Sequence, residues 1–206
     1  MHIIIFKEIS LKKILFSLGG VITSFAAVPF VAASCSKEWE PKERKVVVAD
    51  LNDTSKKAGD KVANYDTVHY TDLSESIDLG GITVNIDWSK FKSDNFIVSK
   101  HKKEGSIGQI FINTYKGSTT IYGKSDTKPF EGVVLGTITG SLPKGFSITN
   151  AESPIYKNSK GNLNSSGYID LIKEGDKIKF KFRFHKYNGK DTAPNISTQV
   201  FEAIIQ

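Results

Sequence analysis

The 206-residue chain contains very little cysteine and very little arginine. Its single cysteine, Cys35, excludes an intramolecular disulfide, so any folded domain must be stabilised by packing. Arg44 and Arg183 are the only arginines, and the remaining basic residues are lysines. Because bidentate recognition of phosphates and guanine edges depends on arginine, we predict no nucleic-acid partner despite a formal net charge of +6.

The motifs of common enzymes and metal sites are also lacking. The four histidines form no pair at the spacing of zinc ligands: His2, His69, His101 and His185. The sequence contains no nucleophile elbow, phosphate loop or metalloprotease motif. We therefore predict a protein that is not an enzyme and that has no metal or cofactor. A glycan-cleaving enzyme is the third-ranked alternative, because two carboxylates distant in sequence can meet in a fold.

The N-terminal region has the organisation of an export signal. Lysines near the start precede residues 14–34, a stretch without charge. The stretch ends in three small residues directly before Cys35: Ala32, Ala33 and Ser34. This pattern predicts a signal helix over residues 1–34 that is removed after export. An uncharged run of this length also fits an uncleaved transmembrane helix, which is the alternative.

The small residues before the lone cysteine resemble the lipobox of bacterial surface lipoproteins of the mollicute type. The resemblance implies cleavage between Ser34 and Cys35 and attachment of a diacylglyceryl group to the Cys35 thiol. Two acyl chains on one cysteine hold a protein stably on a membrane, whereas a single chain binds only marginally. We therefore expect a lipid-anchored, extracellular protein on the outer face of the cell membrane.

The exported part has the length of a single domain. Residues 35–43 are polar and contain Pro41, so we interpret them as the lipidated cysteine and a short tether. Residues 44–206 then form one domain, within the usual range of 50 to 250 residues. Residues 44–79 are a candidate N-terminal extension of it.

Strand signals dominate this domain. Residues 177–185 alternate strictly, with isoleucine and phenylalanine at even positions and cationic side chains at odd positions. A period of two predicts a strand with one face in the core and the other in water. Similar but shorter runs, separated by glycine, asparagine and serine, recur from residue 66 onward. We predict an all-β fold, an antiparallel β-sandwich.

The order of motifs in residues 80–206 is similar to the jelly-roll head domains of phage tail-fibre receptor-binding proteins. The likeness rests on four segments: Gly136-Thr137-Ile138, Leu142-Pro143-Lys144-Gly145-Phe146, Gly167-Tyr168-Ile169-Asp170 and the turn at Gly175. The resemblance implies that the sandwich is jelly-roll-like and forms a homotrimeric head that binds saccharides. It transfers no individual site residue.

Two sets of side chains are candidates for ligand contact. The first is a cationic stripe for an anionic glycan, a lipid headgroup or a partner protein: Lys177, Lys179, Lys181, Arg183 and His185. The alternative for this stripe is a solvated face whose repulsion is relieved by acidic neighbours across the ladder. The second set consists of aromatics near hairpin ends that could stack on sugars or pack in the core: Tyr115, Tyr122 and Phe130.

These observations together predict a membrane-anchored surface lipoprotein that acts as a binding or adhesion module, with a glycan or another host surface molecule as its ligand. A structural or antigenic surface lipoprotein without a specific ligand is the leading alternative.

Overall fold

A computed structural model describes residues 44–53, 55–62, 65–98, 103–113, 119–189 and 192–205. All of them belong to one compact unit within Glu40–Gln206. The predicted signal, its cleavage site at Ser34 and Cys35, the lipid attachment at Cys35 and the tether to residue 43 lie outside the described residues. So does Tyr115. Within the described residues, no helix is long and apolar enough to cross a membrane.

The described residues form strands and short 3₁₀ turns, and they contain no α-helix. The strands are β1 (Val46–Asp50), β2 (Lys61–Val62), β3 (Tyr65–Thr71), β4 (Ile82–Ile86), β5 (Ser106–Ile112), β6 (Thr120–Tyr122), β7 (Val134–Gly140), β8 (Ser147–Asn150), β9 (Ile155–Lys157), β10 (Leu163–Ser165), β11 (Tyr168–Glu174), β12 (Lys177–Lys186), β13 (Asn195–Ser197) and β14 (Phe201–Ile205). The 3₁₀ turns are η3 (Leu79–Gly81), η4 (Ser93–Asn95) and η6 (Pro129–Glu131). The predicted all-β class is confirmed.

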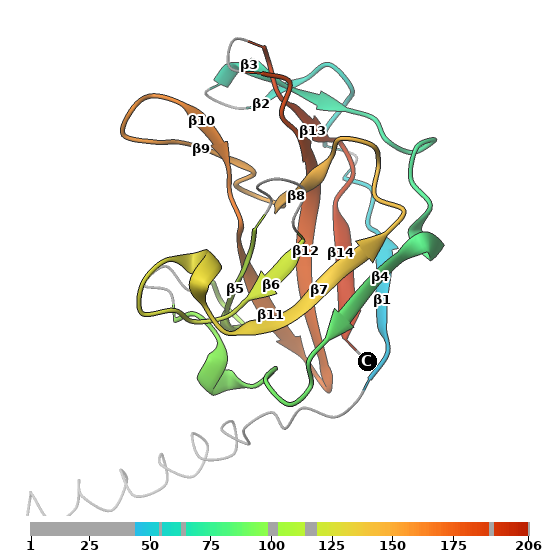
Figure 1. The fold of residues 1–206 in the computed structure, drawn as a ribbon. Helices are drawn as coiled ribbons and strands as arrows, with labels where there is room; N and C mark the ends of the chain where they lie inside the picture. The colour runs from blue at the N-terminus through green and yellow to red at the C-terminus, as the bar shows by residue number, and fades with distance from the viewer. Residues whose placement is uncertain are drawn as a thin grey trace, which may run out of the picture. The chain divides into compact units, whose positions relative to one another are not determined.

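The long strand β12 organises the main sheet. Its first half pairs with β11 and β14, and its second half pairs with β8 and β13. From β11 the sheet continues through β5, β6 and β7 to β4, while β1 is added beyond β14. The sheet folds over itself, so that β4 and β7 lie in front of β12 and β14 and β4 comes beside β1 (Figure 1). Two packed layers result, as expected for a sandwich.

One pairing departs from the antiparallel expectation. The strands β3 and β13 run parallel, with Asn195 opposite His69 and Ser197 opposite Thr71. The main sheet is therefore mixed, and the prediction of a wholly antiparallel sandwich was wrong in this respect. A hairpin enforces antiparallel pairing only between neighbouring strands, and more than a hundred residues separate these two in the sequence.

The alternation along β12 builds the centre of the core, as predicted. Ile178, Phe180, Phe182 and Phe184 are all fully buried. Phe201 on β14 joins them, with its ring centroid 5.7 Å from that of Phe182 and 4.9 Å from that of Phe184. At roughly 1.5 to 3 kcal/mol for each large side chain buried, this row is a major source of stability.

The turn before β12 fixes the register of that row. Glu174 pairs with Lys177, which leaves Gly175 and Asp176 as a two-residue hairpin loop. Gly175 has φ +58°, the left-handed value that the first central position of a type II′ turn requires and that glycine adopts without strain. A slip of one residue would exchange the phenylalanines for the cations, so turn and pattern specify the same register.

A second, smaller core holds the strands at one end of the sheet. It consists of Val62, Val68, Tyr70, Ile155 and Ile196, with the partly buried Leu163 packed against it. These residues tie β2, β3 and β13 to the separate two-stranded sheet of β9 and β10. The cluster therefore sets the position of β3 relative to β12, and the pocket described below lies between these two strands.

Candidate functional site

The predicted cationic stripe on β12 is not a continuous exposed surface. Lys177 is exposed, but Arg183 and His185 are only 3% and 7% exposed. The expectation that all five side chains face water is therefore wrong for these two. The outer face of β12 is covered in its second half, where the chain after β8 and the link between β13 and β14 pass over it.

Acidic neighbours neutralise the middle of the stripe. The carboxylate of Glu202 on β14, which is 6% exposed, lies 3.7 Å from Lys179 Nζ and 3.9 Å from Lys181 Nζ. Lys179 also pairs with Glu174, and this hydrogen bond is the main reason that the pKa of Lys179 is raised and that of Glu174 lowered. These lysines match the solvated, acid-paired alternative better than a free anion-binding face.

Arg183 acts as a clamp between segments that are distant in sequence. Its Nε donates to the carbonyl of Ala151 at 2.8 Å, and its Nη1 donates to the carbonyls of Ser197 at 3.0 Å and Thr198 at 2.6 Å. Its Nη2 pairs with the carboxylate of Asp53. The chain leaves the sheet between β13 and β14, and there Nη1 also donates to the carbonyl of Gln199 at 3.4 Å.

Asp53 is held in its charged form. Its Oδ1 accepts hydrogen bonds from the Ser55 hydroxyl at 2.5 Å and the Ser55 amide at 3.1 Å. The pKa of Asp53 is lowered chiefly by the Ser55 hydroxyl, although burial opposes this, and Arg183 lowers it further. Both charges of the pair are therefore present at neutral pH.

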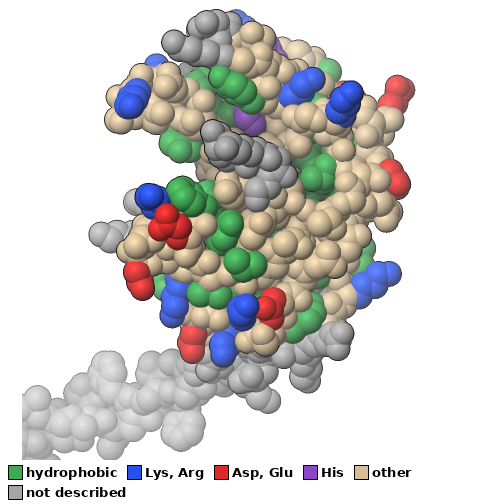
Figure 2. All heavy atoms as spheres, in the orientation of Figure 1, with side chains coloured by type: hydrophobic (Ala, Val, Ile, Leu, Met, Phe, Trp, Pro, Cys, Tyr) green, Lys and Arg blue, Asp and Glu red, His purple; other side chains and the backbone are tan. Residues whose placement is uncertain are grey.

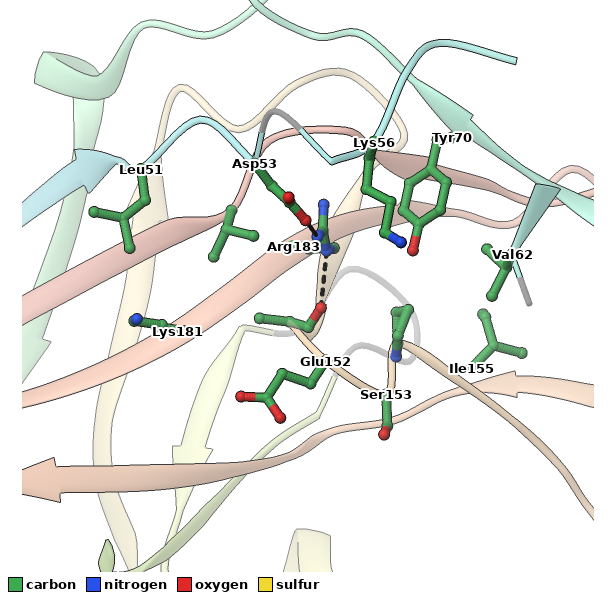
Figure 3. Close-up of a pocket in the computed structure, with 13 residues that line it drawn as sticks. Leu51, Asp53, Lys56, Val62, Tyr70, Glu152, Ser153, Ile155, Lys181 and Arg183 are labelled. Carbon is green, nitrogen blue, oxygen red and sulfur yellow. Dashed lines mark hydrogen bonds and ion pairs between the residues drawn. The ribbon is translucent and has the colours of Figure 1, made fainter. Parts of the chain in front are cut away.

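A pocket of about 640 Å³ lies beside this clamp. Its walls come from the segment after β1, from β2 and β3, from residues 151–155 and from β12 (Figure 3). Tyr70 forms one wall, with the Arg183 guanidinium 5.2 Å from its ring centroid and Lys56 Nζ 5.6 Å from it. We refer to this space as the Arg183 pocket.

The burial of His185 changes its protonation. Burial removes water from the imidazole and lowers its pKa from 6.5 to about 4. The ring is therefore neutral at physiological pH and adds no charge to β12. The positive charge expected at the end of the stripe is absent.

The predicted aromatics are not gathered at one place. Tyr122 lies on β6 and is half-buried, whereas Phe130 lies in η6, is 47% exposed and has Lys128 Nζ 5.7 Å from its ring centroid. With Tyr115 outside the described residues, the structure assembles no stacking site from the predicted set alone.

A different set of apolar side chains does form a line. Tyr168 on β11 pairs with Phe111 on β5, Phe111 pairs with Tyr122 on β6, and Tyr122 pairs with Val134 on β7. Residues directly opposite in antiparallel strands share one face, with Cβ atoms roughly 5 Å apart. We call these four residues the aromatic row.

The aromatic row is accessible from solvent. Tyr168 is 40% exposed and Val134 is 42% exposed, and the ring centroids of Phe111 and Tyr168 are 5.1 Å apart. Burial on one side raises the pKa of Tyr168, with a smaller contribution from nearby Tyr156. Figure 2 shows hydrophobic side chains at the surface below the projecting β9–β10 hairpin.

Hydrogen-bonding groups flank the aromatic row on the same face. Two residues away from Phe111 and Tyr168 on the same strands, Gln109 is opposite Asp170. Gln109 Nε2 donates to the Asp170 carboxylate at 3.2 Å. The Ser106 hydroxyl donates to the same oxygen at 3.0 Å. Rings beside fixed amide and carboxylate groups suit a ligand that has both apolar faces and hydroxyls.

Sequence reasoning found Tyr122 but missed Phe111 and Tyr168. Both occupy outward positions of strands whose alternate residues are buried, in the patterns of residues 106–112 and 168–174. The signal that could have found them is a large aromatic at a solvent-facing position, combined with the strand register. No group of three or more His, Cys, Asp or Glu side chains is placed to hold a metal in the part of the chain that the structure describes.

Replacing Arg183 by methionine should destabilise the fold by about 3 to 5 kcal/mol, because Asp53 and the carbonyls of residues 151, 197 and 198 would lose a buried donor. Urea denaturation measures the change. Lys181→Met on the same strand, whose side chain is 53% exposed, should change stability by only about 0.5 kcal/mol. Equal losses of stability in the two variants would show that Arg183 contributes no more to the fold than an exposed lysine of the same strand.

Stability should fall between pH 6.5 and pH 4 because of His185. The unfolded chain binds a proton there at an ordinary pKa of 6.5, whereas the folded chain resists protonation until about pH 4. The stability is therefore fully present above pH 6.5 and decreases by up to about 3 kcal/mol on acidification. His185→Gln should remove this part of the slope in denaturation curves recorded across the range. If the free energy of unfolding depends on pH in the same way for wild type and His185→Gln, the assignment to His185 is contradicted.

A family model described as Mycoplasma P30 protein matches residues 54–206, which is more than half of the chain. No curated protein and no solved structure matches.

Proposed function

Because the chain belongs to the Mycoplasma P30 protein family, we propose that it is a lipid-anchored surface protein of a mycoplasma whose folded domain binds glycans. The family match supports a mollicute protein of the cell surface. In this proposal the domain binds without catalysing a reaction and uses no metal or cofactor.

The anchor in this proposal is the Cys35 thiol. The uncharged residues 14–34, the small residues before the cysteine and the absence of any other cysteine support a lipidated N-terminus. Two acyl chains would hold the domain on the outer face of the membrane. The polar residues 36–43 would then separate the domain from the lipid surface.

Lipidation can be tested by the mass of the protein extracted from mycoplasma membranes. We expect a mature chain that starts at Cys35 and carries a diacylglyceryl group. Cys35→Ser should leave no acyl group and should move the protein from the detergent phase towards the aqueous phase in a partition assay. An intact Met1 together with an unmodified Cys35 in the wild type would contradict the anchor.

The aromatic row is the observation that carries the binding proposal. Three strand spacings of about 4.8 Å give it a length of roughly 14 Å, which is enough for more than one sugar ring. The apolar faces of sugar rings stack on aromatic side chains, and the sugar hydroxyls need hydrogen-bonding partners beside the stack. The side chains of Gln109 and Asp170 offer such partners next to Phe111 and Tyr168.

Binding should be measured on a glycan array with the detergent-extracted protein. We expect Tyr168→Ala to weaken binding of the best glycan by about 1 kcal/mol, roughly five-fold, through loss of one stacking ring. Tyr187→Ala removes an aromatic that is 63% exposed but lies outside the row, and it should leave binding unchanged.

If wild type binds no glycan on the array, the binding proposal fails. A structural or antigenic role without a specific ligand would then remain for this surface protein. If Tyr168→Ala and Tyr187→Ala behave alike, a glycan binds elsewhere than on the aromatic row.

A further inference from the structure

We propose that the Arg183 pocket binds a small carboxylate-bearing molecule, with Lys56 and Tyr70 as its first polar contacts. The pocket lies between β3 and β12, whereas the aromatic row lies across β11, β5, β6 and β7. This inference is therefore independent of glycan binding on the row.

The pocket has the size and the mixed lining of a small-molecule site. Its volume of about 640 Å³ falls in the usual range of roughly 300 to 1,000 Å³ for ligand pockets. Leu51, Val62 and Ile155 provide apolar walls. Lys56, Tyr70 and Ser153 place polar groups between these walls (Figure 3).

The unpaired charge in the pocket is positive. Of the two carboxylates among the lining residues, Asp53 is paired with Arg183 and Glu152 is paired with Lys103. Lys56 contacts the face of the Tyr70 ring but has no carboxylate partner among the described residues. Lys181 has only Glu202, at 3.9 Å. An anion entering the pocket would thus find the ammonium group of Lys56 without a carboxylate partner, whereas that of Lys181 already has Glu202 beside it.

The Tyr70 hydroxyl is a buried donor without a partner. Tyr70 is 7% exposed, and its hydroxyl makes no hydrogen bond within the described part of the chain. Figure 3 shows this hydroxyl directed into the space above Ser153. Burial raises the pKa of Tyr70, so the group stays protonated and able to donate. A buried hydroxyl is costly when unpaired, and a bound carboxylate oxygen would pair it.

The apolar walls identify an organic acid in preference to an inorganic anion. A phosphate ion would use the ammonium groups and the phenol but would leave Val62 and Ile155 facing a hydrated ligand. A carboxylate attached to a ring or an alkyl group uses both parts of the lining. Sugar acids and acylated amino acids share this chemistry, and the size of the pocket admits either.

The test is calorimetric titration of the detergent-extracted protein with two carboxylates, glucuronate and N-acetylalanine, and with the neutral glucuronamide. We expect at least one of the two carboxylates to bind, with an affinity that falls as salt is added. If glucuronate binds, glucuronamide should bind at least ten-fold more weakly. The carboxylate that binds more tightly identifies the ligand class as sugar acids or as acylated amino acids. Equal binding of glucuronate and glucuronamide, or no binding of either carboxylate, would overturn the proposal.

Two variants connect the binding to the pocket. Tyr70→Phe keeps the ring in the small core and removes only the unpaired hydroxyl, so it should fold with an equal or higher thermal midpoint and bind the carboxylate about ten-fold more weakly. Lys56→Gln should weaken binding to a similar extent. Lys57→Gln alters the next residue, which is exposed and outside the pocket lining, and should leave affinity unchanged. Unchanged affinity in Tyr70→Phe and Lys56→Gln would place any bound carboxylate elsewhere and refute the proposal.

Discussion

The burial of alternate residues along β12 is the constraint on which the rest of the structure depends. Four consecutive even positions are fully buried, and they can be buried together only in the register that Gly175 sets. The neighbours of β12 follow from this register, since β11, β14, β8 and β13 all pair with it. Both the aromatic row and the Arg183 pocket are built on strands positioned in this way.

The opposite face of β12 shows that a period of two predicts direction but does not predict exposure. The odd residues do point away from the phenylalanine row, as the pattern indicates. Whether they reach water depends on residues 151–155 and 197–200, which pass over the second half of the strand. The paths of these segments depend on tertiary contacts, so the burial of Arg183 and His185 could not be predicted from β12 alone.

Prediction from the sequence was most successful where a strand has one solvent-facing side and one buried side. The strand β12 begins at Lys177, the first residue of the predicted alternation. The parallel contact of β3 with β13 was not predictable, because no local signal joins residues so far apart. The aromatic row required the register of four strands, and the pocket required the meeting of Asp53, Tyr70 and Arg183 from three distant segments.

The two arginines of the chain both connect segments that are distant in sequence. Arg44 Nη1 donates to the carbonyl of Asp176 at 2.6 Å, and Arg183 donates to four carbonyls and one carboxylate. Both join segments more than a hundred residues apart. A lysine has three donors on one atom and could not span the groups that the planar fork of Arg183 reaches. Arg183 therefore stands where the fold needs several donors in fixed directions, whereas Lys56 and Lys181 supply charge to the lining of the pocket.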